Sequence, residues 1–179
     1  MFASAPLPGG SELRLIEPTD ATAIAAALTA NREYLAPWEP ARPDVYFTAA
    51  WWSEEIARSR RAVNAGTMLP LVIARGREIV GRFTLGGITR GAFQSAGLGY
   101  WVAQESAGHG LASAAVAAIV DGATFDLGLH RIEASTLLHN GASQRVLEKA
   151  GFIKIGMAPQ YLSIADRWQD HLIFQRLLH

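Results

Sequence analysis

The chain has 179 residues, half of them hydrophobic and 18% charged, which predicts one domain spanning residues 1–179 with a sizeable core. Its 16 basic residues are matched by 16 acidic ones, so the net charge gives no general attraction to nucleic acid. The absence of cysteine excludes disulfides, thiolate metal sites and a cysteine nucleophile.

No stretch is apolar over the length needed to cross a bilayer, and the first ten residues lack the charged start and apolar run of a signal peptide. We therefore expect a cytoplasmic protein with no membrane partner. The five histidines lack any metal-ligand spacing such as H-E-x-x-H, so no metal ion is expected. A monomer or a weak homodimer is the expected oligomeric state.

In the first third of the chain, proline and glycine separate two expected helices. Residues 1–10 are rich in both and are expected to be flexible, and alternating apolar residues predict a short strand at 13–15. A helix capped by Thr19 or Asp20 is expected over 21–35. The loop 37–43 contains three prolines, which exclude helix and central strand, and a second helix is expected over 48–66.

The rest of the chain alternates strands with two further helices. Strands are expected at about 69–74, 78–88, 96–102, 131–138, 152–163 and 168–178, with helices at 108–127 and 142–150. Because no repeating strand–helix–strand period is present, this order predicts an α/β chain with a mixed sheet and helices on both faces.

The turn Gly108-His109-Gly110 stands between an apolar strand and a long alanine-rich helix. Backbone N–H groups in the first turn of a helix have no internal partner, and the helix dipole adds roughly half a positive charge there. Glycines let a phosphate approach the backbone closely, so the turn predicts an anion site. No lysine follows Gly110, which argues against a P-loop, and Ser113 breaks the G-x-G-x-x-G dinucleotide fingerprint.

The order of elements around this turn resembles the GCN5-related N-acetyltransferase (GNAT) family, whose phosphate loop reads Q/R-x-x-G-x-G/A. The segment from Ala107 to Ala112 matches that loop except at its first position, where Ala107 replaces Gln or Arg. The resemblance implies the acyl-CoA N-acyltransferase fold, a mixed and mostly antiparallel sheet of about seven strands with about four helices. It also implies acetyl-CoA as the co-substrate.

A second informative stretch reads His139-Asn140-Gly141-Ala142-Ser143. Many family members have N-x-x-A-x-x-x-Y here, where the asparagine holds the thioester region and the tyrosine protonates the departing thiolate. This chain has Ser143 at the alanine position and Leu147 at the tyrosine position, which puts a hydroxyl one helical turn earlier on the same face. The N-x-x-S form resembles the RimJ/RimL subgroup, which acetylates N-terminal amines of ribosomal proteins.

The loop that follows the first helix also resembles the RimJ-type enzymes, which have N-R-x-x-L-x-P-W-E-P here. The likeness extends to the segments 88–93, 98–100, 130–132, 161–162 and 167–171. It implies that the acceptor, a protein or peptide N-terminus beginning with alanine or serine, is bound by Asn31, Tyr34, Trp38 and Glu39.

The resemblance assigns roles to named residues. The cofactor-binding residues are Trp101, Val102, Ala103, Gly108, His109, Gly110, Leu111, Ala112, Asn140 and Ser143. In this assignment an N–H near Val102 stabilises the oxyanion, Asn140 positions the thioester, and Ser143 is the catalytic proton donor. The base stays open, with Glu39, Glu105 or an ordered water as candidates.

Each assignment has a plainer alternative. Asn140 is also a fitting helix N-cap, Ser143 an ordinary first-turn residue, and Trp38 a packing residue. The acceptor could instead be a free small amine such as a polyamine or an antibiotic. Leu147 and Ala107 also leave open a module that binds acyl-CoA without turnover.

Overall fold

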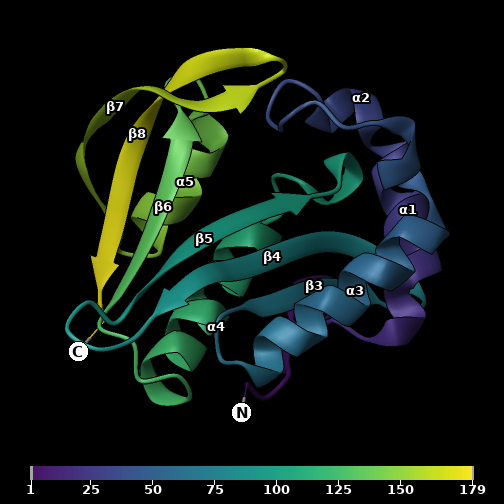
Figure 1. Cartoon of the computed structure of the whole chain (residues 1–179), viewed down its shortest axis with the longest axis horizontal. Coiled ribbons are helices and arrows are strands. Elements are labelled where there is room, and N and C mark those ends of the chain that lie inside the picture. The colour runs from purple at the N-terminus through teal and green to yellow at the C-terminus, as the bar shows by residue number, and fades with distance from the viewer. Residues whose placement is uncertain (1, 179) are drawn as a thin grey trace.

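The computed structural model describes residues 2–178, which form one eight-stranded mixed sheet in the order β1-β2-β3-β4-β5-β6-β8-β7 (Figure 1). The strands are β1 Ala5–Leu7, β2 Ser11–Leu15, β3 Leu69–Arg75, β4 Glu78–Thr89, β5 Ser95–Val102, β6 Arg131–Leu137, β7 Ile153–Ile164 and β8 Arg167–Leu177. The helices are α1 Ala21–Ala30, α2 Arg32–Leu35, α3 Ala49–Asn64, α4 Leu111–Phe125 and α5 Gly141–Lys149. Over residues 2–178, no helix is both long and apolar enough to cross a membrane.

Helices cover both faces of the sheet, as the pattern predicts. Helices α1 and α3 pack on one face, and α4 and α5 pack on the other (Figure 1). Strand β3 shows why two cores form: Leu71 and Ile73 belong to the core under α4, whereas Val72 and Ala74 belong to the core under α1 and α3. Because successive side chains of a strand point to opposite faces, β3 reads as a continuous apolar run.

The sheet holds together across a short parallel junction. Strands β5 and β6 pair only through Ser95–Gly97 and Arg131–Glu133, although β5 continues to Val102 and β6 to Leu137. Figure 1 shows the two strands diverging beyond that point. The second half of β5 is therefore paired on one side, to β4, and has no strand on the other side among the described residues.

Two details differ from the sequence-based prediction. Ala5–Leu7, where no strand was predicted, pair with Ser11–Leu13 through a hairpin in which Gly9 and Gly10 take positive φ values. This hairpin raises the strand number from the expected seven to eight. The single helix expected over 21–35 breaks at Asn31, which leaves α-helical geometry and separates α1 from α2, so five α-helices form rather than four.

Candidate active site

The predicted anion site lies where α4 begins. Gly108 and Gly110 adopt φ values of 79° and 78°, in the left-handed region that glycine enters without strain. A Cβ at either position would meet nothing within 4 Å, so the turn is open. No side chain of the described residues caps this helix start. The first-turn N–H groups of a 15-residue helix are therefore available to an anion.

The other residues of this loop differ in exposure. His109 is exposed, whereas Leu111 is buried in the α4 core and Ala112 is partly buried against it. Leu111 and Ala112 thus anchor the helix start, and the backbone of the loop is what remains open to a ligand.

The open side of β5 presents a specific amide. The Ala103 N–H donates to the Val80 carbonyl of β4 at 2.8 Å, so it faces β4. Because N–H directions alternate along a strand, the Val102 and Tyr100 N–H groups face the side where β6 has diverged. Three cofactor-binding residues were predicted here. Trp101 is buried in the core under α1 and α3, and the Ala103 N–H is hydrogen-bonded to β4. The Val102 N–H is the one that faces the open side of the strand.

The start of α5 faces the same opening. The Asn140 Oδ1 accepts the Ser143 N–H at 3.1 Å, so Asn140 caps the helix and fixes its first turn. The Ser143 Oγ lies 2.8 Å from the Oη of Tyr100 on β5. Leu147 is fully buried, so the position of the family's tyrosine is part of the core. Tyr100 is thus a candidate site residue that the sequence reasoning missed, because no local motif connects it with Ser143.

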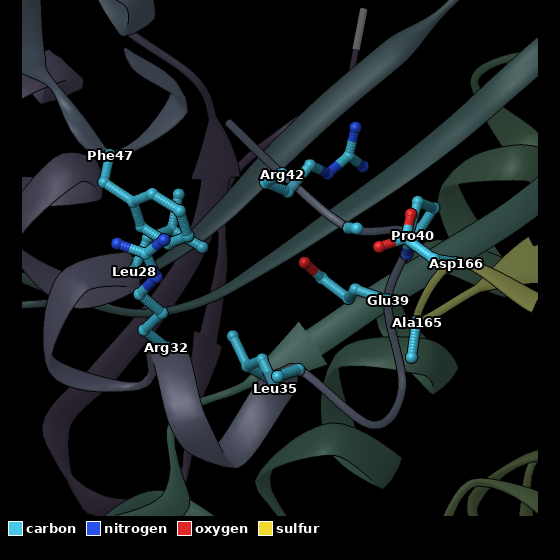
Figure 2. A pocket seen from close by; sticks show the side chains of 11 residues that line it. Leu28, Arg32, Leu35, Glu39, Pro40, Arg42, Phe47, Ala165 and Asp166 are labelled. Atoms are coloured by element: carbon cyan, nitrogen blue, oxygen red, sulfur yellow. The ribbon is translucent and has the colours of Figure 1, made fainter. Parts of the chain in front are cut away.

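A pocket of about 290 Å³ lies beside the loop that follows α2 (Figure 2). Its lining comes from two distant parts of the chain: Leu28, Arg32, Leu35, Ala36, Glu39, Pro40, Ala41, Arg42 and Phe47, with Ala165 and Asp166. The Ala165 N–H donates to the Glu39 carbonyl at 3.1 Å, which joins the turn between β7 and β8 to this loop. Figure 2 shows the Glu39 carboxylate pointing into the pocket.

The surroundings of Glu39 change its acidity. Loss of water around the carboxyl raises its pKa above the ordinary 4.5, and the positive charges of Arg42 and Arg82 oppose that rise. Arg82 extends from β4 with its Cζ 5.1 Å from the centre of the Trp52 ring. Its buried Nε has no hydrogen-bond partner in the described part of the chain. Burial lowers the pKa of this guanidinium, although it remains a cation at neutral pH.

The other predicted acceptor residues take different positions. Trp38 is 36% exposed and its ring lies 5.4 Å from that of His139, so the loop that follows α2 adjoins the start of α5. Tyr34 is partly buried against the core under α1 and α3. Asn31 is buried, with its Nδ2 donating to the Ala27 carbonyl and its Oδ1 accepting the Gln104 N–H, both at 2.8 Å. Its amide is thus occupied within the protein.

The alternative base Glu105 lies away from this pocket. It is exposed in the turn Gln104–Ser106 and lines a separate groove of about 650 Å³ with Arg77 and Glu78. Of the two carboxylates that the sequence offered, Glu39 is the one that lines this pocket, and it is the chain neighbour of Trp38, whose ring lies beside His139.

The buried amide of Asn31 leads to a prediction about stability. Asn31→Ala removes both hydrogen bonds and leaves the Gln104 N–H without its partner, so the free energy of unfolding is expected to fall by about 2 kcal/mol. Urea unfolding at pH 7 measures this loss. The control is Asn64→Ala at the exposed end of α3, expected to change stability by less than about 0.5 kcal/mol. Equal stability of the two variants would mean that the Asn31 bridge contributes nothing.

The chain matches known proteins over most of its length. The Acetyltransferase (GNAT) domain family matches residues 12–153. The probable N-acetyltransferase YjcK of Bacillus subtilis (strain 168) is 34% identical over 163 residues, covering 90% of both chains. The structure of ribosomal-protein-S5-alanine acetyltransferase from Vibrio fischeri has a TM-score of 0.94 at 31% identity, covering 98% of this chain and 96% of that one. Mycobacterium smegmatis RimJ in complex with CoA-disulfide has a TM-score of 0.91 at 35% identity, covering 98% and 86%.

Proposed function

The chain belongs to the GNAT acetyltransferase family and is an acetyl-CoA-dependent N-acetyltransferase, and we propose that its acceptor is the N-terminal α-amine of a ribosomal protein beginning with alanine or serine. The acceptor class is supported by the likeness to the Vibrio fischeri enzyme, whose name specifies the alanine of ribosomal protein S5. On this proposal the enzyme works in the cytoplasm, as a monomer or a weak homodimer.

The observation that carries the proposal is the meeting of three elements at one opening. The start of α4 offers unpaired N–H groups, the divergence of β5 from β6 leaves the Val102 amide free, and the start of α5 presents Ser143. A diphosphate fits the first, since no side chain fills the turn at Gly108 and Gly110. An extended pantetheine arm fits the rest of the open β5 edge, including the Tyr100 N–H, because it hydrogen-bonds to a strand edge as an added strand does, and the Val102 N–H is left for the reacting carbonyl.

The pocket beside the loop that follows α2 is the proposed acceptor site, and its Glu39 supplies the base. The Glu39 carboxylate accepts a proton from the incoming ammonium, so that the neutral amine attacks the thioester carbonyl. The Val102 N–H stabilises the oxyanion. As the carbon–sulfur bond breaks, the Ser143 hydroxyl donates its proton to the departing sulfur, and a second proton leaves the former amine nitrogen and restores the serine hydroxyl, so the products are the amide and the free thiol. Holding both reactants in this geometry supplies roughly 7–11 kcal/mol of the lowered barrier.

The charges of the pocket favour a peptide over a polycation. Glu39 and Asp166 line it together with Arg32 and Arg42, so its lining is mixed in sign rather than acidic. A polyamine or aminoglycoside site requires an excess of carboxylates to balance several ammonium groups. A pocket whose two carboxylates are balanced by two guanidinium groups is a better match for a single α-ammonium than for a polycation.

Mass spectrometry of acetylated products tests the proposal. Peptides with free N-terminal alanine or serine are expected to gain one acetyl group on the α-amine, whereas matched peptides beginning with methionine and the polyamine spermidine are not. Acetylation of the small amine alone would retain the chemistry and overturn the acceptor. Absence of any product, together with a melting temperature raised by acetyl-CoA, would favour a module that binds without turnover.

A further inference from the structure

We propose that Tyr100 is a positioning residue for the reaction, directing the proton of the Ser143 hydroxyl toward the departing sulfur. The inference rests on the proposed role of Ser143 and adds a residue that lies 43 positions away in the chain. The two side chains reach each other across the divergence of β5 and β6, from the strand on one side and from the start of α5 on the other.

Either hydroxyl can donate across the 2.8 Å contact between Tyr100 and Ser143, and in the proposed arrangement the phenol is the donor. Burial raises the pKa of Tyr100 to about 12, so the phenol keeps its proton throughout the neutral range and remains a donor. Its nearest partner is the Ser143 Oγ at 2.8 Å, and the Ser143 carbonyl lies farther away at 3.4 Å. When the phenol donates to Oγ, the hydroxyl proton of Ser143 is left to donate to a third atom.

Both members of the pair are fixed independently. The Tyr100 ring stacks on Phe83 with centroids 5.0 Å apart and planes at 6°. The Ser143 backbone is held by the N-cap of Asn140 at 3.1 Å. A hydroxyl that already accepts a hydrogen bond is a stronger donor, because successive hydrogen bonds polarise one another. The pair therefore orients the serine proton and strengthens it as a donor.

The arrangement also explains how a phenol serves this site without the family's tyrosine. The helix position that carries that tyrosine is Leu147, which is fully buried. Here a phenol approaches from β5 instead and acts through the serine rather than directly on the sulfur.

Three variants test the inference: Tyr100→Phe, Ser143→Ala and the double variant. Phenylalanine keeps the stacking on Phe83 and removes only the hydroxyl. Tyr100→Phe is expected to lower kcat by about 10- to 100-fold, with the KM for acetyl-CoA changed less than twofold. Ser143→Ala is expected to lower kcat by about 10- to 1000-fold. The double variant is expected to match Ser143→Ala alone, because the phenol acts only through the serine.

The control is Tyr161→Phe, which removes a phenol hydroxyl from an exposed residue of β7 and is expected to leave kcat unchanged. Circular dichroism melting curves establish that all variants fold. If Tyr100→Phe retains full kcat while Ser143→Ala is impaired, the inference is overturned and the proposed function stands. The inference is also overturned if the loss of kcat in the double variant equals the product of the losses in the two single variants. If Ser143→Ala retains full kcat, the role of Ser143 itself is overturned, and the inference with it.

Discussion

The Gly110→Asp variant is expected to bind acetyl-CoA at least about 100-fold more weakly than the wild-type chain while keeping its fold. Gly110 precedes α4 in the left-handed region, which aspartate and asparagine tolerate better than other residues, and a Cβ there meets nothing within 4 Å. The new carboxylate stands where a diphosphate is expected. Two like charges about 5 Å apart in partly screened surroundings repel by about 3 kcal/mol, which corresponds to about two orders of magnitude in affinity.

The matched control is Gly110→Asn, which has the same shape and no charge. Isothermal titration calorimetry with acetyl-CoA is expected to give a Kd within about tenfold of wild type for Asn and a much weaker one for Asp. Similar Kd values for the two variants would show that the diphosphate lies elsewhere, because shape and backbone strain are the same in both.

The Glu39→Gln variant is expected to lose about 10²–10⁴ in kcat/KM toward an alanine-initiated peptide, the usual contribution of a general base. Glutamine keeps the size of the side chain in the pocket and removes its ability to accept the ammonium proton. Because a peptide α-amine titrates near pH 7.7–8.0, the loss is expected to shrink as the pH rises through that range and the amine deprotonates in solution. Initial rates at pH 6.5 and 9 measure both effects.

The same variant is expected to be more stable than the wild type at pH 7. Burial raises the pKa of the Glu39 carboxyl in the folded chain above 4.5, its ordinary value in the unfolded chain. The folded chain therefore holds the carboxyl proton more tightly than the unfolded chain does. The stability linked to that proton is present below pH 4.5 and is lost as the pH rises through the folded pKa. Urea unfolding is expected to show the gain of Glu39→Gln at pH 7 and its disappearance near pH 4.

Glu33→Gln is the control for both measurements, because Glu33 is exposed on the adjacent α2 and does not line the pocket. It is expected to leave kcat/KM and stability unchanged. A Glu39→Gln enzyme with wild-type kcat/KM at pH 6.5 would remove Glu39 from the mechanism, and a loss of stability at pH 7 would mean that Arg42 and Arg82 outweigh the cost of burial.

Local sequence signals were sufficient for most of the fold. The turn Gly108–Gly110 leads into α4, although the helix begins at Leu111 rather than at the predicted 108, and the prolines of 37–43 keep that segment out of helix and strand as predicted. Asn140 caps α5, which was the plainer alternative to its assigned role. These features depend on backbone conformation within a few residues, so the sequence carries them directly. The strand Ala5–Leu7 was missed because it has only three residues, contains a proline and is formed by pairing with β2.

The site was harder to predict because its contacts are long-range. Alternation along β5 indicates which face Tyr100 occupies, but not that the divergence from β6 brings it to Ser143. Likewise, nothing near Glu39 in the sequence points to Arg82 on β4, whose charge opposes the effect of burial on the Glu39 pKa. The motif around Asn31 predicts an acceptor contact, whereas the fold turns its side chain toward Gln104.

The hydrogen bond from Ala165 to Glu39 has a consequence for how such enzymes diversify. It joins the loop around Glu39 to the turn between β7 and β8, two short surface segments that are far apart in the sequence. The hydrogen bond depends on the left-handed conformation of that turn at Ala165 and Asp166. Neither segment belongs to the larger apolar core, so changes there leave the strands and the start of α4 undisturbed. Related enzymes can therefore change their acceptor specificity through paired substitutions in these two segments, while the sheet and the start of α4 stay the same. Because the contact joins backbone groups of both segments, grafting a loop of different backbone shape alone into a related scaffold is expected to lose it, and a graft of both segments is expected to keep it.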